Sequence, residues 1–317
     1  MPKRNLQKKI YGGYLFPTLW LTKHFNPGTN IYSEEWDTLI ILDACRVDAL
    51  REVSDEYDFI KNVDTRWSVG STSKEWLINT FKNKYEEQIN ETALVTGNAW
   101  AEMVFEQSPD WGSWTSLTDT FWHGHPIGQI AKRNIVSHAD FYEYLPVWSN
   151  TNNVENSAPR AKSVTDAAIE TARNRHPEKL IVHYMQPHEP FFHDSGPEES
   201  LSKKDKKPMD VLRADGNKNE IWGRYIDNLR YVLDSVKLLL ENHNAGKVII
   251  TADHGELFGE LGLHGHLAAF PHPNLRRVPW VKTEAKDEES YRPERRFSDF
   301  KDTSGNVQER LKDLGYV

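Results

Sequence analysis

The sequence has almost no cysteine, since Cys45 is the only one among 317 residues. A single cysteine cannot form an intramolecular disulfide or supply a cysteine-based zinc site, so both are excluded. An excess of basic residues is also absent: 39 Lys and Arg against 47 Asp and Glu give a formal net charge of −8. Sequence-independent binding to nucleic acid needs a basic face, so nucleic acid is not expected as a partner.

Long apolar runs are absent as well. The N-terminal stretch MPKRNLQKKIYGGYLFPTLWLTKHF has a basic start and an apolar run, but Gly-Gly and Pro17 interrupt it. The run is too short to span a bilayer and lacks the small-residue cleavage site of a signal peptide. The expectation is a cytoplasmic protein; contact of this segment with a membrane surface stays open, and nothing in the sequence indicates the oligomeric state.

Four short apolar runs predict buried strands, because strands covered on both faces read as continuous apolar segments. They are Asp37 to Ala44, Thr92 to Ala99, Lys179 to Gln186 and Lys247 to His254. Helical spacing of apolar residues predicts helices over Ser163 to Arg175 and Ile221 to Glu241. Strands that alternate with helices indicate an α/β fold, with a mostly parallel central sheet and helices on both faces.

The sequence divides into an N-terminal extension (1–30), a catalytic domain (31–282) and a charged C-terminal tail (283–317), within which Val307 to Leu314 predicts a short closing helix. Residues 97–160 form a less regular insertion that we expect at the rim of the sheet. Its tryptophans are suited to sugar stacking or, more simply, to core packing: Trp111, Trp114, Trp122 and Trp148. The polar stretch from His193 to Asn219 predicts a mobile surface loop.

Metal- and proton-competent residues follow three of the four predicted strands. The first strand ends in Asp43, the third is followed by His188 and contains His183, and the fourth ends in Asp253 and His254. In open parallel sheets the functional groups gather at the C-terminal edge of the strands. A lone Asp there is usually a helix cap and a lone His a core residue, but three such strand ends favour a site for a divalent cation.

These segments resemble motifs of one family. ITADHGELFGELGLHGH resembles the strand-DHGE-loop motif of the sulfatase-like branch of the alkaline phosphatase superfamily. HYMQPHEPF is similar to its PHxPY segment, ILDACRVDAL to its first strand motif, and WGRYIDNLRYVLDSVKLLLE to the helix before its last strand. The resemblance covers roughly residues 36–280 in the right order and implies an alkaline-phosphatase-like fold with ester-cleaving activity.

The family implies a nucleophile at a helix N-terminus after the first strand, and SVGSTSKEWL is the matching stretch. It offers Ser71, Thr72 and Ser73. Aligning Lys74 with the family's proline favours Thr72, although the neighbours stay open as alternatives. The simpler interpretation is that these hydroxyls only cap the helix.

Two departures from the family shape the expected chemistry. Sulfatases need Cys or Ser within C/S-x-P-x-R for conversion to formylglycine, and this stretch lacks both that proline and that arginine, which favours an unmodified hydroxyl and phosphoryl transfer. Two-zinc members carry Asp and His four residues apart after the third strand, whereas Gln186 precedes Pro187 and His188 here. One metal ion is therefore expected.

The resemblance then implies a role for each residue. One divalent cation (Mn, Mg, Ca or Zn) binds Asp43, Asp253, His254 and Thr72, His188 protonates the leaving oxygen, and the substrate is contacted by His266, His264 and His183. The expected substrate is a small-molecule or a glycan- or lipid-linked phosphate ester. The alternatives are a sulfate-ester hydrolase on the same scaffold, or a non-catalytic protein that binds a glycan or a lipid head group.

Overall fold

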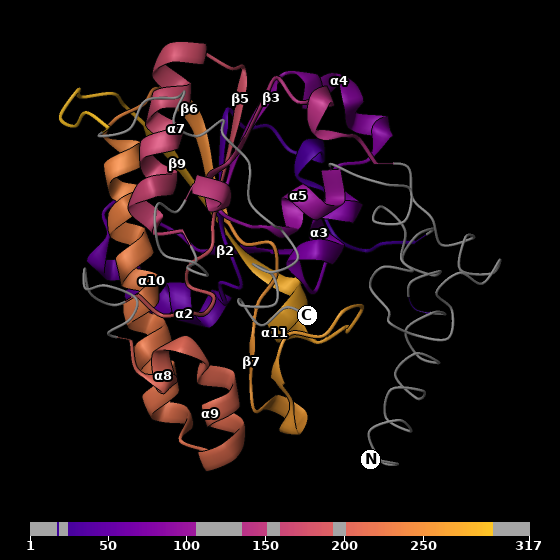
Figure 1. The fold of residues 1–317 in the computed structure, drawn as a ribbon, viewed down its shortest axis with the longest axis vertical. Coiled ribbons are helices and arrows are strands. Elements are labelled where there is room, and N and C mark those ends of the chain that lie inside the picture. The colour runs from indigo at the N-terminus through magenta and orange to yellow at the C-terminus, as the bar shows by residue number, and fades with distance from the viewer. Residues whose placement is uncertain (1–17, 19–24, 106–134, 151–158, 193–200, 294–317) are drawn as a thin grey trace.

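The computed structural model describes residues 18, 25–105, 135–150, 159–192 and 201–293 (Figure 1). At its centre lies a seven-stranded sheet with the order β2-β9-β6-β1-β5-β3-β4. Its strands are β1 (Thr38–Leu42), β2 (Asp64–Trp67), β3 (Thr92–Thr96), β4 (Glu143–Pro146), β5 (Lys179–Tyr184), β6 (Ala245–Thr251) and β9 (Arg277–Ala285). The neighbours from β6 to β4 are parallel, and β9 is antiparallel to both β6 and β2. The expected mostly parallel α/β sheet is confirmed.

The central position of β1 in the sheet explains why its sequence is apolar throughout. All five of its residues are buried. Because side chains alternate between the two faces of a strand, Ile40 and Leu42 pack in one core cluster, and Leu39 and Ile41 in the other. All four predicted strands are present, but the sheet pairing stops before the last residues of each predicted run. Those residues enter turns at the C-terminal edge of the sheet.

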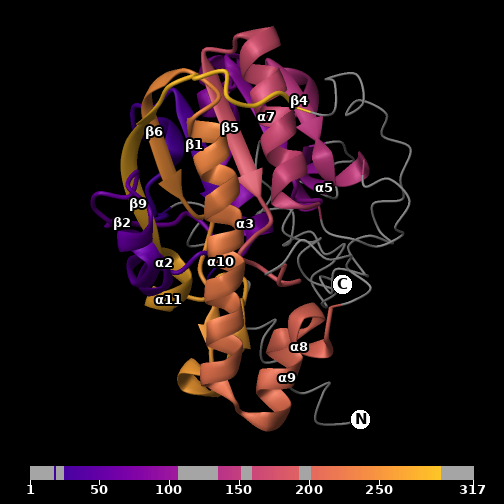
Figure 2. The same cartoon turned by 90° about the vertical axis from the view of Figure 1, so that its left-hand side faces the viewer.

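Helices cover both faces of the sheet (Figures 1 and 2). One face packs against α2 (Val47–Val53), α7 (Ala161–Arg175) and α10 (Lys218–Leu240), and the other against α3 (Ser73–Thr80) and α5 (Trp100–Phe105). The short helix α4 (Glu86–Asn90) precedes β3. The two predicted helices are α7 and α10. The start predicted at Ser163 is two residues late, because the chain already turns helical after Arg160 and Ser163 lies inside α7.

The surface loop expected from His193 to Asn219 is wrong over most of its described length. Two helices lie there, α8 (Lys203–Lys206) and α9 (Pro208–Asp215). A capping box between Ser202 and Asp205 starts α8, and a proline at the first position starts α9, both of which favour helix initiation. The segment Leu201 to Pro208 is rich in lysine and has few apolar positions. Its helix-start signals were therefore not recognised in the sequence.

The expected insertion (97–160) contains α5 and β4 among its described residues, and β4 joins the central sheet beside β3. Trp148 is buried in the core, whereas Trp111, Trp114 and Trp122 lie outside the described residues, as does the helix expected at 307–314. The domain boundaries stay a prediction; β9 extends through Ala285. Over the described ranges, no helix is both long and apolar enough to cross a membrane.

Candidate active site

The turn after β1 brings the first acidic residue to the C-terminal edge of the sheet. Asp43 directly follows the strand, and Ala44 adopts a left-handed conformation with φ of 59°, which is uncommon for a residue with a side chain. The amide of Ala44 donates to Asp253 Oδ1 at 3.1 Å, and Asn98 Nδ2 donates to Asp43 Oδ2 at 2.8 Å. Each carboxylate thus has one oxygen held by the protein, and the other oxygens, Asp43 Oδ1 and Asp253 Oδ2, are buried without a hydrogen-bond partner.

Asp43, Asp253 and His254, called the metal group below, bring one ligand atom each within 4.8 Å of one another. His254 Nε2 lies 3.5 Å from Asp43 Oδ1 and 3.5 Å from Asp253 Oδ2. The other ring nitrogen, Nδ1, donates to the Gly255 carbonyl oxygen at 2.7 Å. This bond fixes the tautomer, so Nε2 presents its lone pair to the two unpaired oxygens.

The charges and the burial of the metal group favour the binding of a cation. Burial, and then repulsion from Asp253 and Glu256, raise the pKa of Asp43 well above its usual range. Burial lowers the pKa of His254, which keeps the imidazole neutral. Two adjacent buried carboxylates are costly without a counter-charge. A divalent cation would satisfy both orphaned oxygens, and the carboxylate and imidazole donors fit such an ion.

The start of α3 decides which hydroxyl faces the metal group. Thr72 is the N-cap, and its Oγ1 accepts a hydrogen bond from the Glu75 amide at 3.2 Å. Ser71 Oγ lies 2.8 Å from both Glu75 Oε2 and the Leu267 carbonyl oxygen, so its single hydroxyl proton is shared between these two acceptors. Ser73, the first helical residue, has its Oγ 3.3 Å from Asp43 Oδ2 and 3.2 Å from His254 Nε2. Of the three candidates it is therefore Ser73, and not the favoured Thr72, that contacts the metal group.

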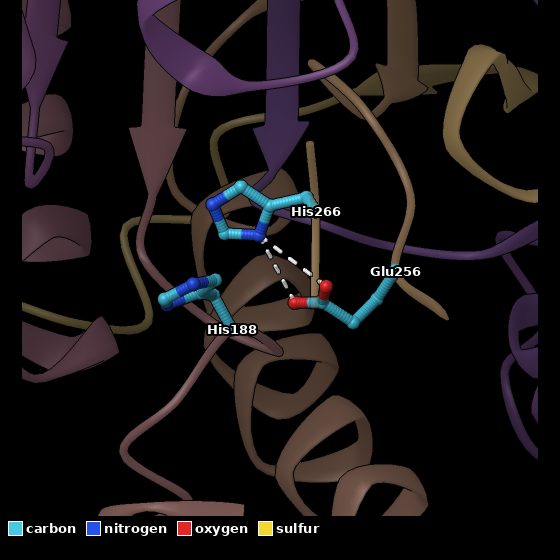
Figure 3. Close-up of side chains that lie close together, drawn as sticks. All are labelled: His188, Glu256 and His266. Atoms are coloured by element: carbon cyan, nitrogen blue, oxygen red, sulfur yellow. Dashed lines mark hydrogen bonds and ion pairs between the residues drawn. The ribbon is translucent and has the colours of Figure 1, made fainter. Parts of the chain in front are cut away.

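A second cluster, called the histidine group below, consists of His188, Glu256 and His266 (Figure 3). His266 Nδ1 lies 3.3 Å from both carboxylate oxygens of Glu256. The ring of His266 lies between its two histidine neighbours, with centroids 5.3 Å from His188 and 4.6 Å from His254. The histidine group therefore adjoins the metal group, and the two form one site.

The two histidines of this group differ in their tendency to carry a proton. Burial opposes charging of His266, but the Glu256 carboxylate outweighs it and raises the pKa of His266. Burial, and then the neighbouring His266, lower the pKa of His188 to about 4. His188 Nδ1 donates to the Glu189 carbonyl oxygen at 2.8 Å, which suits a neutral ring with its lone pair on Nε2. Of these two histidines, His266 is the one whose surroundings favour the protonated form.

The remaining predicted site residues lie elsewhere. His183 is fully buried in β5, 3.8 Å from Asp253 Oδ2, and packs edge-on against Trp76. It therefore adjoins the metal group through Asp253. His264 lies half-buried in β8 (His264–Gly265), which pairs with β7 (Leu257–Phe258) in a short hairpin. His264 belongs to neither group.

The sequence-based site omitted two residues that the structure brings to it. Asn98 lies two residues after β3 and donates to Asp43, which itself directly follows the buried strand β1. Glu256 is the last residue of the Asp-His-Gly-Glu segment and pairs with His266. Both signals were present in the sequence: a polar side chain after a strand for Asn98, and a motif residue without an assigned role for Glu256.

Together, fold and site define an α/β protein with a buried carboxylate, imidazole and hydroxyl centre at the C-terminal edge of a mostly parallel sheet. No protein-family model and no curated protein matches the chain. Solved structures do match. The soluble domain of lipooligosaccharide phosphoethanolamine transferase A from Neisseria meningitidis is 14% identical, with a TM-score of 0.48, over 78% of this chain and 76% of that chain.

Two further matches are similar in kind. The C-terminal periplasmic domain of a phosphoethanolamine transferase from Campylobacter jejuni is 15% identical, with a TM-score of 0.45, over 80% of this chain and 79% of that one. The lipoteichoic acid synthase from Listeria monocytogenes is 8% identical, with a TM-score of 0.37, over 84% and 71%. The motifs of this chain resemble the sulfatase-like branch of the alkaline phosphatase superfamily, and its fold is alkaline-phosphatase-like. At these identities and TM-scores the matches carry no conclusion about activity or location, and the cytoplasmic location expected from the sequence is left without support.

Proposed function

We propose that the protein is a metal-dependent enzyme that transfers or hydrolyses phosphate esters, with Ser73 as its nucleophile. One observation carries this proposal: two buried carboxylate oxygens without partners face a neutral imidazole nitrogen, with a serine hydroxyl at hydrogen-bond distance. Adjacent buried carboxylates are costly unless they are hydrogen-bonded or paired with a positive charge, so two such oxygens side by side favour a cation site over simple packing.

The metal group would hold one divalent cation through Asp43, Asp253 and His254, with Ser73 Oγ as a fourth donor. Oxygen and imidazole donors of this kind accommodate Mn, Mg, Ca or Zn. When bound, such a cation lowers the pKa of a coordinated hydroxyl and offsets the charge of a phosphate. Asn98 keeps Asp43 in place through its hydrogen bond to Oδ2, which leaves Oδ1 for the cation.

The chain's own residues then account for each bond change. Ser73 enters the reaction as an alkoxide, its proton having been lost to water, and its Oγ bonds to phosphorus while the bond to the leaving oxygen breaks. The leaving oxygen takes a proton from the histidine group. An acceptor, water or an alcohol, next attacks the phosphoserine, returns a proton to that group and releases Ser73. The N-terminus of α3 favours the negative charge on Ser73 Oγ.

The sequence assigned the proton to His188, and we propose His266 instead. The Glu256 carboxylate beside His266 stabilises its imidazolium form, whereas the Nδ1–H of His188 is engaged with the Glu189 carbonyl oxygen. His188 then contacts the phosphate or stabilises the neighbouring ring. His183 supports Asp253 and takes no part in substrate binding.

The substrate class that we propose is a phosphate ester of a larger group, linked to a lipid or a glycan. The matched proteins bear names that refer to phosphoethanolamine transfer and to lipoteichoic acid synthesis, and both involve phosphate esters. A sulfate ester is less well supported, because the stretch that begins at Ser73 lacks the proline and the arginine that conversion to formylglycine requires.

Three alanine variants test the nucleophile. Ser73→Ala should lower turnover of bis(p-nitrophenyl) phosphate by roughly 10³-fold or more, because it removes the attacking atom. Thr72→Ala should cost about 1 kcal/mol of stability, as expected for a lost N-cap, and keep most of the activity. Ser71→Ala is the matched control for a buried hydroxyl in the same turn. Mass spectrometry of quenched enzyme should find a phosphoryl adduct on Ser73.

The substrate panel includes p-nitrophenyl phosphate and p-nitrophenyl sulfate, each with metal-free enzyme and with added Mn²⁺ or Zn²⁺. Full activity of Ser73→Ala together with loss in Thr72→Ala would return the nucleophile to Thr72. Faster cleavage of the sulfate than of either phosphate would overturn the proposed ester class. A metal-induced thermal shift without turnover of any ester would favour a non-catalytic binding protein.

A further inference from the structure

The histidine group depends on a hairpin that has little strength of its own. Glu256 immediately precedes β7, and His266 immediately follows β8. Each strand has two residues, paired as Leu257 with Gly265 and Phe258 with His264. A ribbon of this length is not stable in isolation. Something outside the hairpin must therefore hold Glu256 and His266 opposite His188.

Arg46 makes that connection. Its Nη1 donates to the Glu256 carbonyl oxygen at 3.1 Å and to Glu260 Oε1 at 2.8 Å, so one nitrogen binds both the base and the tip of the hairpin. Its Nε and Nη2 donate to the two carboxylate oxygens of Asp48, at 2.9 and 2.6 Å. The planar guanidinium suits such a fork, which a lysine cannot reproduce.

The surroundings of Arg46 keep it in one position. Its side chain is 7% exposed, and the guanidinium carbon lies 5.0 Å from the Trp222 ring centroid and 5.6 Å from that of Phe258. Ring contacts of this kind add to the ion pairs. Glu260 is equally constrained, because Asn274 Nδ2 donates to its Oε1 at 3.1 Å and the Phe258 amide donates to its Oε2.

The same residue also belongs to the turn that carries the metal group. The Arg46 amide donates to the Tyr225 hydroxyl oxygen at 3.0 Å, and that hydroxyl donates to the Ala44 carbonyl oxygen at 2.7 Å. Ala44 in turn holds Asp253 through its amide. Arg46 is thus tied to both groups of the site, to the metal group by its backbone and to the histidine group by its side chain.

We infer that Arg46 and Glu260 are positioning residues, which hold the β7–β8 hairpin so that Glu256 and His266 face His188. Neither touches the reacting atoms. The part of this inference that concerns proton delivery rests on the proposed function, whereas the part that concerns the placement of the hairpin does not.

The experiment compares Arg46→Met with Arg173→Met, a matched control at the far edge of the sheet. Arg173 binds the Asp287 carboxylate with Nε and Nη2, at 2.8 and 2.6 Å, and the Tyr291 carbonyl oxygen at 2.8 Å. Both variants remove a two-pronged ion pair and a bond to a carbonyl oxygen, so both should lower the melting temperature. Hydrogen exchange measured by mass spectrometry should accelerate in residues 256–266 only in Arg46→Met.

Activity gives the second readout. Arg46→Met should slow a phosphodiester with an alkyl leaving group by about tenfold more than bis(p-nitrophenyl) phosphate, because the alkyl alkoxide needs the proton and nitrophenolate does not. Glu260→Gln, which keeps the shape of the side chain, should change both readouts in the same direction, and it replaces Arg46→Met should that variant not fold. Arg46→Lys should recover only part of the loss.

Unchanged exchange in residues 256–266 in both Arg46→Met and Glu260→Gln would overturn the inference, as would equal effects of Arg46→Met and Arg173→Met on the two ester types. Failure of the proposed function is a separate outcome. If the wild-type protein cleaves no ester, the exchange measurement still decides whether Arg46 and Glu260 hold the hairpin.

Discussion

The buried histidines at the two edges of the central sheet differ in whether their ring nitrogens are hydrogen-bonded. At the N-terminal edge, His243 Nδ1 donates to the Leu239 carbonyl oxygen at 2.8 Å, and Nε2 bonds Thr38 Oγ1 at 3.1 Å. At the C-terminal edge, His183 is completely buried and neither ring nitrogen has a hydrogen-bond partner. Both histidines are buried against the same sheet, but of the two only His183 has ring nitrogens without a hydrogen-bond partner.

The carboxylates follow the same division. Asp287, at the N-terminal edge, is paired with Arg173, whereas Asp43 and Asp253 each keep an oxygen without a partner. A cavity of about 470 Å³ opens at the N-terminal edge, with Arg173 and His243 in its lining, and the hydrogen bonds of both are already made. A cavity alone is therefore a weaker sign of function than an unsatisfied buried group, because folding tolerates such groups only where something else compensates for them.

The largest effect is expected when one carboxylate at each edge of the sheet is replaced by an amide. Asp253→Asn should reduce turnover by roughly 10³-fold or more, because it removes charge from the metal group, and should abolish the rise in melting temperature on adding Mn²⁺ or Zn²⁺. Asp287→Asn should cost roughly 1.5–3 kcal/mol, the value of a hydrogen bond to a charged group, and leave turnover and the metal response intact. If both variants lost the rise in melting temperature on adding metal, the two edges of the sheet would not differ in metal binding.

A smaller effect separates the two histidines of the histidine group. His266→Asn should slow alkyl phosphodiesters by roughly 10²–10⁴-fold, the usual contribution of a general acid, and nitrophenyl esters far less. His188→Asn should slow both ester types alike. The measurement is kcat/KM for a matched pair of esters at several pH values. The reverse pattern would restore His188 as the proton donor, and loss of a second equivalent of bound metal in either variant would indicate a second cation site.

The smallest effect concerns stability against pH in metal-free protein. Burial lowers the pKa of His183 and of His188 to about 4, below the ordinary value of roughly 6.5 for histidine. The unfolded chain therefore binds these protons first, so the stability that these two histidines contribute should fall as the pH drops from about 6.5 to about 4, and their contribution should change little above that window. Each group contributes at most about 3 kcal/mol.

Urea unfolding at a series of pH values measures that slope. His183→Asn should make it shallower, because the amide does not titrate in this range. An identical slope in the wild type and the variant would mean that His183 is not a buried neutral group.

Much of the fold was predictable because the relevant residues obey local rules. The runs around β1 and β6 are apolar on both faces, which predicts buried parallel strands. β9 was not predicted: Pro279 lies inside it opposite Thr65 of β2, and proline normally argues against a strand between two neighbours. Its pairing depends on the other strands, so no local signal could have revealed it.

Part of the arrangement at the candidate site was predictable from the sequence. Asp43, Asp253 and His254 were expected to converge, and their ligand atoms lie within 4.8 Å of one another. The sequence could not separate Thr72 from Ser73, because one step along a helix turns a side chain by about 100°, and only the packing of α3 decides which one faces inward. The roles of these residues stay predictions.

The central position of β1 has a consequence for how the chain folds. Ala44 and Asp253 meet although they are 209 residues apart in sequence. β1 lies between β5 and β6, both of which come much later in the chain. Contacts of such long range slow folding, because a large loop must close before they form. Asp43 and Asp253 therefore come together only when β6, the last parallel strand in the sequence, pairs with β1. The repulsion between the two carboxylates does not act on the earlier steps of folding.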